Sequence, residues 1–245
     1  MDLETTAHLR EKIDVSPASW DHVFSPTSVL AVISSVDSAG RVNAAPFGSC
    51  IRVCHDPVHI AFTVNFGDLA SPSRREGRYW SHDTHDNVLA TGEFVVNVVP
   101  FERAVIEKIF ICGLPFKQGV NELEKAGLTG LSSKTVRPPR IAECHAHFEC
   151  KVEWTRAWAH RKMILGRVTA VSVDEGCLDE RGWPLLDRIR PTHFSQGKIV
   201  PAFQVTSVPW QYAGSREDLV DGYDGPLQGP TTGPSDSAAS VRPGL

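Results

Sequence analysis

Short apolar runs rich in β-branched residues recur along the first hundred residues and are separated by turn signals. The run 28–36 ends at the turn 37–40 and returns as 42–47, which is the pattern of a β-hairpin. Asp56-Pro57 breaks the chain, and 58–64 follows as a third apolar run. We therefore predict three strands here, with an irregular segment between the second and the third.

Later segments continue the strand pattern. The run 93–99 predicts a further strand, and 145–154 alternates polar and apolar residues, so that one face is wet and the other packs on a core. The segment 163–173 is expected to be its antiparallel partner. These strands predict a sheet built mainly from hairpins.

Helical signals are short. Ser, Asp and Thr residues before Gly92 predict a helix within 81–92, and apolar residues at helical spacing predict another over 101–110. The segment 121–126 before Gly127 predicts one more. Short helices between strands that are joined by turns favour a mainly β, antiparallel barrel over βαβ units.

The composition divides the chain into three parts. Residues 1–24 are polar and are expected to form an N-terminal arm, and 25–213 carry the predicted strands and form one barrel domain. From 214 to 245 the chain is rich in Gly, Pro, Ser and Asp and is expected to be a flexible tail.

Charge and cysteine content restrict the partners and the compartment. The formal net charge is -4 and no block of Lys and Arg occurs, so no nucleic acid is expected as a partner. No apolar run approaches the roughly 20 residues that span a bilayer, and the acidic N-terminus does not resemble a signal peptide, so no membrane association is expected. The scattered cysteines are expected to be reduced thiols in a cytoplasmic protein.

The stretch 40–50 is the first candidate ligand site. A strand that ends in Pro, Gly, Ser and Cys brings backbone N–H groups to the surface of a sheet, where they can bind an anionic or heteroaromatic ligand. The alternative is an ordinary hairpin with a bulge.

The start of the helix predicted within 81–92 is the second candidate. The hydroxyl of Thr84 and the free N–H groups of a helix N-terminus can hold a phosphate, and nearby Arg74, Arg75 and Arg78 can add charge-assisted hydrogen bonds. The alternative is a helix N-cap beside a solvated arginine loop.

The strand predicted over 145–154 carries a candidate metal site. His145, His147 and Glu149 share one strand face, which is compatible with metal binding. The alternative is the solvent face of an amphipathic strand, and no metal is expected because closed zinc sites show tighter Cys and His pairing. Phosphate-binding glycine motifs and the Gly-x-Ser-x-Gly elbow are absent from the sequence.

Taken in order, several motifs resemble the flavin reductase-like family of FMN-binding split barrels. That family includes flavoredoxins and the reductase components of two-component monooxygenases. The resemblance covers about residues 25–200 and rests on 37–41 leading into 42–49, Asp56-Pro57, Asp83-Thr84 with Asn87, 92–98, 126–129 and 138–143. His82 stands where the family has a lysine, which replaces a permanent charge by one that depends on pH.

The resemblance implies a six-stranded antiparallel Greek-key split β-barrel with short flanking helices, acting as a homodimer with FMN near the subunit interface. It implies that the stretch 43–50 lies along the flavin ring and that the helix start lies beside the phosphate and ribityl chain. The implied cofactor-binding residues are Asn43, Ala45, Pro46, Phe47, Ser49, Cys50, Arg74, Arg75, Asp83, Thr84 and Asn87.

The implied activity is transfer of a hydride from NADH or NADPH to FMN, and of electrons onward to free flavin, a partner monooxygenase or a small organic acceptor. The chemistry belongs to the cofactor, so no catalytic side chain is named. His193 is a candidate contact for the second substrate. The alternatives are an FMN-bound enzyme or electron carrier acting on one specific organic substrate, and a non-enzymatic ligand- or metal-binding β-barrel.

Overall fold

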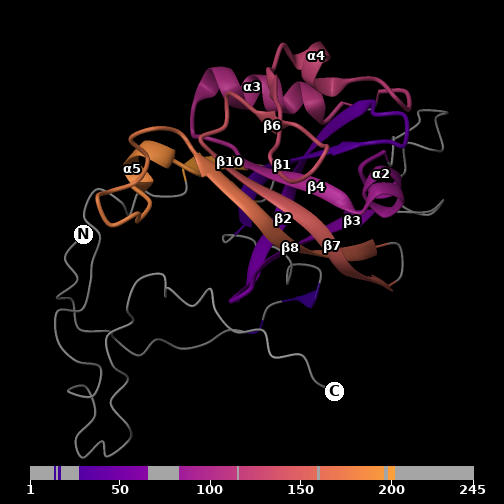
Figure 1. Ribbon diagram of the computed structural model, residues 1–245, viewed down its shortest axis with the longest axis horizontal. Coiled ribbons are helices and arrows are strands. Elements are labelled where there is room, and N and C mark those ends of the chain that lie inside the picture. The colour runs from indigo at the N-terminus through magenta and orange to yellow at the C-terminus, as the bar shows by residue number, and fades with distance from the viewer. Residues whose placement is uncertain are drawn as a thin grey trace, which may run out of the picture.

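The computed structural model describes residues 14, 16–17, 28–65, 83–114, 116–158, 161–195 and 198–201. Figure 1 shows α3 and α4 together above the strands, with α2 to the right and α5 to the left. In chain order the elements are β1 (Ser28–Val36), β2 (Val42–His55), β3 (Val58–Asn65), α2 (Asp83–Thr91), β4 (Glu93–Val98), α3 (Arg103–Cys112), α4 (Glu122–Ala126), β5 (Gly130–Leu131), β6 (Arg140–Ile141), β7 (Ala146–Trp158), β8 (Arg161–Val173), α5 (Leu186–Ile189), β9 (Thr192–Ser195) and β10 (Lys198–Pro201).

Six strands close into an antiparallel barrel. Their order is β1-β2-β3-β8-β7-β4, and β4 returns to pair with β1. The β9–β10 hairpin pairs with the first residues of β1, beside the stretch that β4 occupies. The mainly β, six-stranded antiparallel barrel expected from the sequence is therefore confirmed.

Strand β1 is buried on both faces. Ala31 and Ile33 point into the barrel, whereas Leu30 and Val32 belong to a second cluster outside it. This double burial explains why the strand is an uninterrupted apolar run rather than an alternating one.

Aromatic rings fill the inside of the barrel. Phe62 packs edge-to-face on Phe94 with ring centroids 5.1 Å apart, and Phe47 packs on Phe62 in the same way. A Cβ on Gly166 would lie only 2.4 Å from Cζ of Phe94, so β8 needs a glycine at this position.

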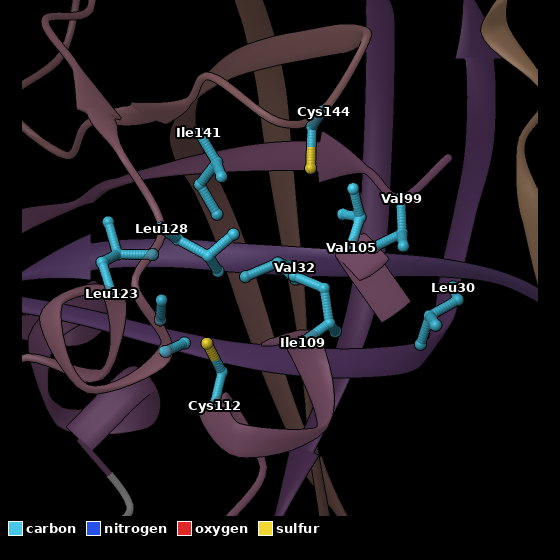
Figure 2. Close-up of a cluster of buried hydrophobic side chains, with 12 residues drawn as sticks. Leu30, Val32, Val99, Val105, Ile109, Cys112, Leu123, Leu128, Ile141 and Cys144 are labelled. Atoms are coloured by element: carbon cyan, nitrogen blue, oxygen red, sulfur yellow. The ribbon is translucent and has the colours of Figure 1, made fainter. Parts of the chain in front are cut away.

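The outer cluster lies between the barrel and the helices. Val105, Ile109 and Cys112 of α3 and Leu123 and Ala126 of α4 pack on the outer face of β1. Figure 2 shows several of these side chains meeting those of β1, together with Ile141 and Cys144 from the connection to β7. The helices thus supply the second face that β1 needs.

The helices predicted from local patterns are confirmed as α2, α3 and α4. Two strand expectations are wrong. Most of the segment after Phe47, which was expected to be irregular, is part of one continuous strand, β2, which runs to His55 with a register shift. The polar face expected to be wet is buried at His147 and Glu149, because the segment 132–141 lies over it.

Much of the expected N-terminal arm 1–24 and the whole tail 214–245 lie outside the described residues. Within the described residues, no helix has the length and the hydrophobicity to cross a membrane.

Candidate functional site

The first half of β2 has a strand neighbour on one side only. β1 pairs with residues 42–47, whereas β3 joins β2 only from Ile51 onward. N–H groups of alternate residues point to the same edge of a strand, and the Ala44 N–H points to the edge away from β1. The next residue whose N–H would point to this edge is Pro46. Proline has no N–H, but the missing donor would face away from β1, so the ladder with β1 continues through Pro46. A register shift then separates Phe47, which pairs with Ala31, from Cys50, which pairs with Val29, so Gly48 and Ser49 lie outside the regular ladder with β1.

Glu122 occupies the first amide of this edge. Its Oε2 accepts the Ala44 N–H at 3.0 Å, and the residue is only 4% exposed. Burial raises the pKa of the Glu122 carboxyl, and the nearby Asp83 carboxylate raises it further. The hydrogen bond from Ala44 acts in the opposite direction but does not outweigh them. No sequence signal marks this role, because Glu122 follows the helix N-cap Asn121, where an acidic residue is ordinary.

Buried amides and hydroxyls join β2 to α2. Asn43 Nδ2 donates to Thr84 Oγ1 at 2.9 Å and to Ser35 Oγ at 3.1 Å, and Asn87 Nδ2 donates to Ser35 Oγ at 3.3 Å. Asn43, Thr84 and Asn87 are each at most 8% exposed. The two segments singled out in the sequence, 41 residues apart at Asn43 and Thr84, therefore join in one hydrogen-bonded network. Ser35 was missed because it lies within an otherwise apolar strand.

The N-terminus of α2 is tied to the connection before α4. Asp83 Oδ2 accepts the Gly119 N–H at 2.9 Å. Gly119 has a φ of +78°, and a Cβ on it would lie 2.7 Å from Nη1 of Arg41. The Arg41 guanidinium thus lies against the backbone that binds Asp83, and it also pairs with Asp37 at 2.6 Å. Arg41 is a cation of this site that sequence reasoning did not assign.

The second half of the β2 stretch faces the barrel and β3. Ala45 pairs with Ile33, and Phe47 packs on Phe62 with centroids 5.2 Å apart. Ser49 exchanges hydrogen bonds with the backbone of Thr63, each at 3.1 Å. Burial raises the pKa of the Cys50 thiol to about 12. These side chains are held by the fold, so ligand contacts along this stretch are left to the backbone.

His193 lies two strands away from Cys50. It pairs with Val29 of β1, and Val29 pairs with Cys50, so the three residues form one row across β9, β1 and β2. The predicted contacts Arg74 and Arg75 lie outside the described residues.

The residues of the candidate metal site, His145, His147 and Glu149, have separate partners. His145 contacts Asp174 at 2.7 Å and Glu102 at 3.3 Å, whereas His147 Nδ1 lies 3.0 Å from Asn97 Oδ1. Burial lowers the pKa of His147 to about 4. Among the described residues, no group of three or more His, Cys, Asp and Glu residues could hold a metal ion.

Glu149 is bound by backbone rather than by a second ligand. Its carboxylate accepts the N–H groups of Lys134 and Thr135 at 2.6–3.0 Å and the Thr135 hydroxyl at 2.8 Å. Burial acts to raise the pKa of Glu149, but these hydrogen bonds outweigh it and lower that pKa. The alternating polar residues of β7 thus anchor the covering segment 132–141.

Comparison with solved structures shows the fold again. Nitrilotriacetate monooxygenase component B from Bacillus cereus superimposes with a TM-score of 0.65 at 18% identity, covering 84% of this chain and 99% of that one. Flavoredoxin of Desulfovibrio vulgaris gives 0.62 at 18% identity, covering 85% and 100%. The 2-nitrobenzoate 2-nitroreductase NbaA from Pseudomonas fluorescens gives 0.62 at 21% identity, covering 91% and 96%.

Sequence comparison gives nearer relatives. An uncharacterized protein of Aquifex aeolicus is 37% identical over 172 residues, covering 70% of this chain and 82% of that protein. The uncharacterized protein YwrF of Bacillus subtilis is 33% identical over 169 residues, covering 66% and 77%. The family model described as flavin reductase like domain matches residues 25–197, most of the chain. The chain therefore belongs to the flavin reductase-like family.

Proposed function

We propose that this protein is an FMN-dependent oxidoreductase that takes electrons from NADH or NADPH. It passes them to free flavin, a partner monooxygenase or a small organic acceptor. The observation that carries the proposal is the buried hydrogen bond between Asn43 and Thr84, because it unites the free edge of β2 with the start of α2. Membership in the flavin reductase-like family supports a flavin as the bound cofactor.

The donors of this site fit an FMN. Thr84 receives a hydrogen bond from Asn43, so its hydroxyl hydrogen can point to a phosphate or ribityl oxygen, and the α2 N-terminus favours negative charge. Arg41 offers a cation against the Gly119 backbone, whose N–H binds the Asp83 carboxylate. FMN, when bound, supplies the redox chemistry of the site.

The ring of the flavin is assigned to the later part of the β2 stretch. Glu122 holds the Ala44 N–H, and Pro46 has none. The backbone of Gly48 and Ser49, at the register shift of β2, is therefore the part that offers donors to the flavin carbonyls and N5. The task of the side chains of Phe47, Ser49 and Cys50 is to fix this backbone.

The decisive experiment is the spectrum and mass of the cofactor that copurifies, followed by titration of the stripped protein with FMN. A yellow protein that binds FMN supports the proposal, and Asn43→Ala should weaken binding, whereas Asn121→Ala should not, because Asn121 caps α4 outside the network. A colourless protein that fails to bind added FMN would refute the proposal.

Steady-state oxidation of NADH and NADPH then separates the electron acceptors. Turnover of free FMN or FAD indicates a flavin reductase that can feed a monooxygenase. Tight FMN with little turnover of free flavin indicates direct reduction of a specific organic acceptor. Oxidation of neither dinucleotide by the FMN-loaded protein would refute the assignment of the electron donor.

We further propose that the protein is a homodimer in which a second copy covers an apolar row on the outside of the barrel. Ile51, Ala61, Leu165 and Trp154 are successive cross-strand partners on β2, β3, β8 and β7. Ile51 is 58% and Trp154 is 45% exposed. Side chains of this size are rarely gathered at the surface of a monomer.

Sedimentation tests the dimer. The native chain is expected to sediment as a dimer and Ile51→Lys as a monomer. The matched control is Leu178→Lys, because Leu178 is also exposed but lies outside the barrel strands, and this variant should remain a dimer. A native monomer at all concentrations, or an Ile51→Lys variant that stays dimeric, would contradict this assembly.

A further inference from the structure

A thiol, an imidazole and a carboxylate meet at the far end of β2 from Asn43. Cys54 of β2 and His59 of β3 are direct cross-strand partners beside the turn Asp56-Pro57. Glu153 comes from β7, next to a register shift, and its Oε2 contacts Nε2 of His59. This cluster is outside the site described above.

Both ring nitrogens of His59 face acceptors. Nδ1 lies 2.8 Å from the Pro57 carbonyl oxygen, and Nε2 contacts the Glu153 carboxylate. A neutral imidazole has a single N–H, so only the imidazolium donates to both. The hydrogen bond to Glu153 raises the pKa of His59, and the Pro57 carbonyl and the Cys54 side chain add to this. These contacts favour the imidazolium form of the ring next to the Cys54 thiol.

The neighbouring strands add charge of the same sign. Arg167 of β8 is the cross-strand partner of His59, and Lys151 of β7 is the partner of Arg167. Directly opposite residues share a face of the sheet, so Lys151, Arg167, His59 and Cys54 form one row. The other charged or titratable residues of the hairpin are Arg52, His55 and Asp56. The Cys54 sulfur therefore belongs to a row whose other members are Lys151, Arg167 and His59.

The thiol is also reachable. Cys54 is half-buried, and its Sγ donates a hydrogen bond of 3.5 Å to the Asp56 carbonyl, close to the surface. Burial raises the pKa of the other described thiols, to about 12 for Cys50 and Cys112. Burial also raises the pKa of Cys144, Cys150 and Cys177. All five thiols are therefore poor nucleophiles near neutral pH.

We propose that Cys54 is a nucleophilic thiol site for low-molecular-weight disulfides, with the His59 ring placing positive charge beside the attacking sulfur and Glu153 positioning the ring. The Cys54 sulfur attacks one sulfur of the disulfide, forming a new S–S bond while the original S–S bond breaks. The departing thiolate takes up a proton from solvent, so Cys54 is oxidised to a mixed disulfide and half of the reagent is reduced to a thiol. The site is independent of the flavin chemistry proposed above.

Reaction of the native protein with dithiodipyridine tests the site, because this neutral aromatic disulfide releases a coloured product. We expect one fast equivalent per chain, located at Cys54 by peptide mass. Cys54→Ser should abolish this fast phase, and Cys177→Ser should retain it. A fast phase located at another cysteine, or the lack of a fast phase, would overturn the proposal.

The pH profile tests His59 and Glu153. His59→Gln should slow the reaction near pH 7 by about tenfold, and the deficit should shrink as the pH rises and the His59 ring of the native protein loses its proton. Glu153→Gln should slow it in the same direction and serves as the second variant if His59→Gln unfolds. Circular dichroism establishes that each variant is folded. Rates equal to those of the native protein in both folded variants would refute the role of the imidazolium.

Discussion

Glu122 allows the sharpest test of the site, because one side chain combines a needed hydrogen bond with an unfavourable charge. Its carboxylate accepts the buried Ala44 N–H at 3.0 Å, but burial and Asp83 raise its pKa. Glu122→Ala removes the acceptor and should lower the free energy of unfolding by about 1–3 kcal/mol, the cost of an unsatisfied buried donor. Glu122→Gln keeps a carbonyl acceptor and removes the charge, so it should be at least as stable as the native chain at neutral pH.

The two variants also differ in their dependence on pH. A folded-state pKa raised above the unfolded value means that the contribution of Glu122 to stability is fully present below the unfolded pKa. That contribution is lost as the pH rises through the folded pKa. The advantage of Glu122→Gln over the native chain should therefore grow from acid toward neutral pH.

Denaturant unfolding at a series of pH values measures both effects. Glu124→Gln is the matched control, because Glu124 is an exposed carboxylate of the same helix, and it should change the free energy of unfolding little at any pH. If Glu122→Gln costs as much as Glu122→Ala at neutral pH, or its advantage does not depend on pH, the reasoning about the buried carboxylate is refuted.

Three further predictions use other parts of the fold. Thr84→Ala should weaken FMN binding by about 1–2 kcal/mol in a fluorescence titration, whereas Thr91→Ala, at the other end of α2, should not; equal affinities would remove Thr84 from the site. Gly166→Ala brings a Cβ within 2.4 Å of Phe94 and should cost about 1–3 kcal/mol in thermal unfolding, with partial recovery in the double variant with Phe94→Leu; an unchanged Tm would show that the barrel interior can yield. The pKa of His59 is raised, so its contribution to stability should be present below the unfolded pKa and be lost as the pH rises through the folded pKa. In denaturant unfolding at a series of pH values, His59→Gln should abolish this dependence, and a free energy of unfolding that varies with pH as in the native chain would contradict the prediction.

Elements whose packing is decided by local pattern could be predicted from the sequence. The apolar run of β1 and the helical spacing of α3 are confirmed because both segments bury the faces that their residues indicate. The resemblance to the family also placed the segments 43–50 and 83–87 on one ligand, and the structure joins them through the hydrogen bond between Asn43 and Thr84. The ligand itself stays a prediction.

Features that depend on distant segments could not be predicted. Pro46 and Gly48 are strand breakers in general, yet β2 continues through them because that edge of the strand has no ladder to maintain. His147 and Glu149 seemed to be a wet face because the segment that covers them, 132–141, has no periodic pattern of its own. Glu122 and Arg41 acquire their roles only through contacts across the fold.

The half-open edge of β2 has a consequence for self-association. An exposed strand edge with free amides can recruit a strand from another molecule and so begin aggregation. Here a carboxylate occupies the Ala44 amide and the next position, Pro46, has none, so little of the edge can template a foreign strand. Gly48 and Ser49, at the register shift, are the remaining part of this edge, and the flavin proposed to bind there would cover it. If the proposed site is right, loading with FMN should also protect the protein from aggregation.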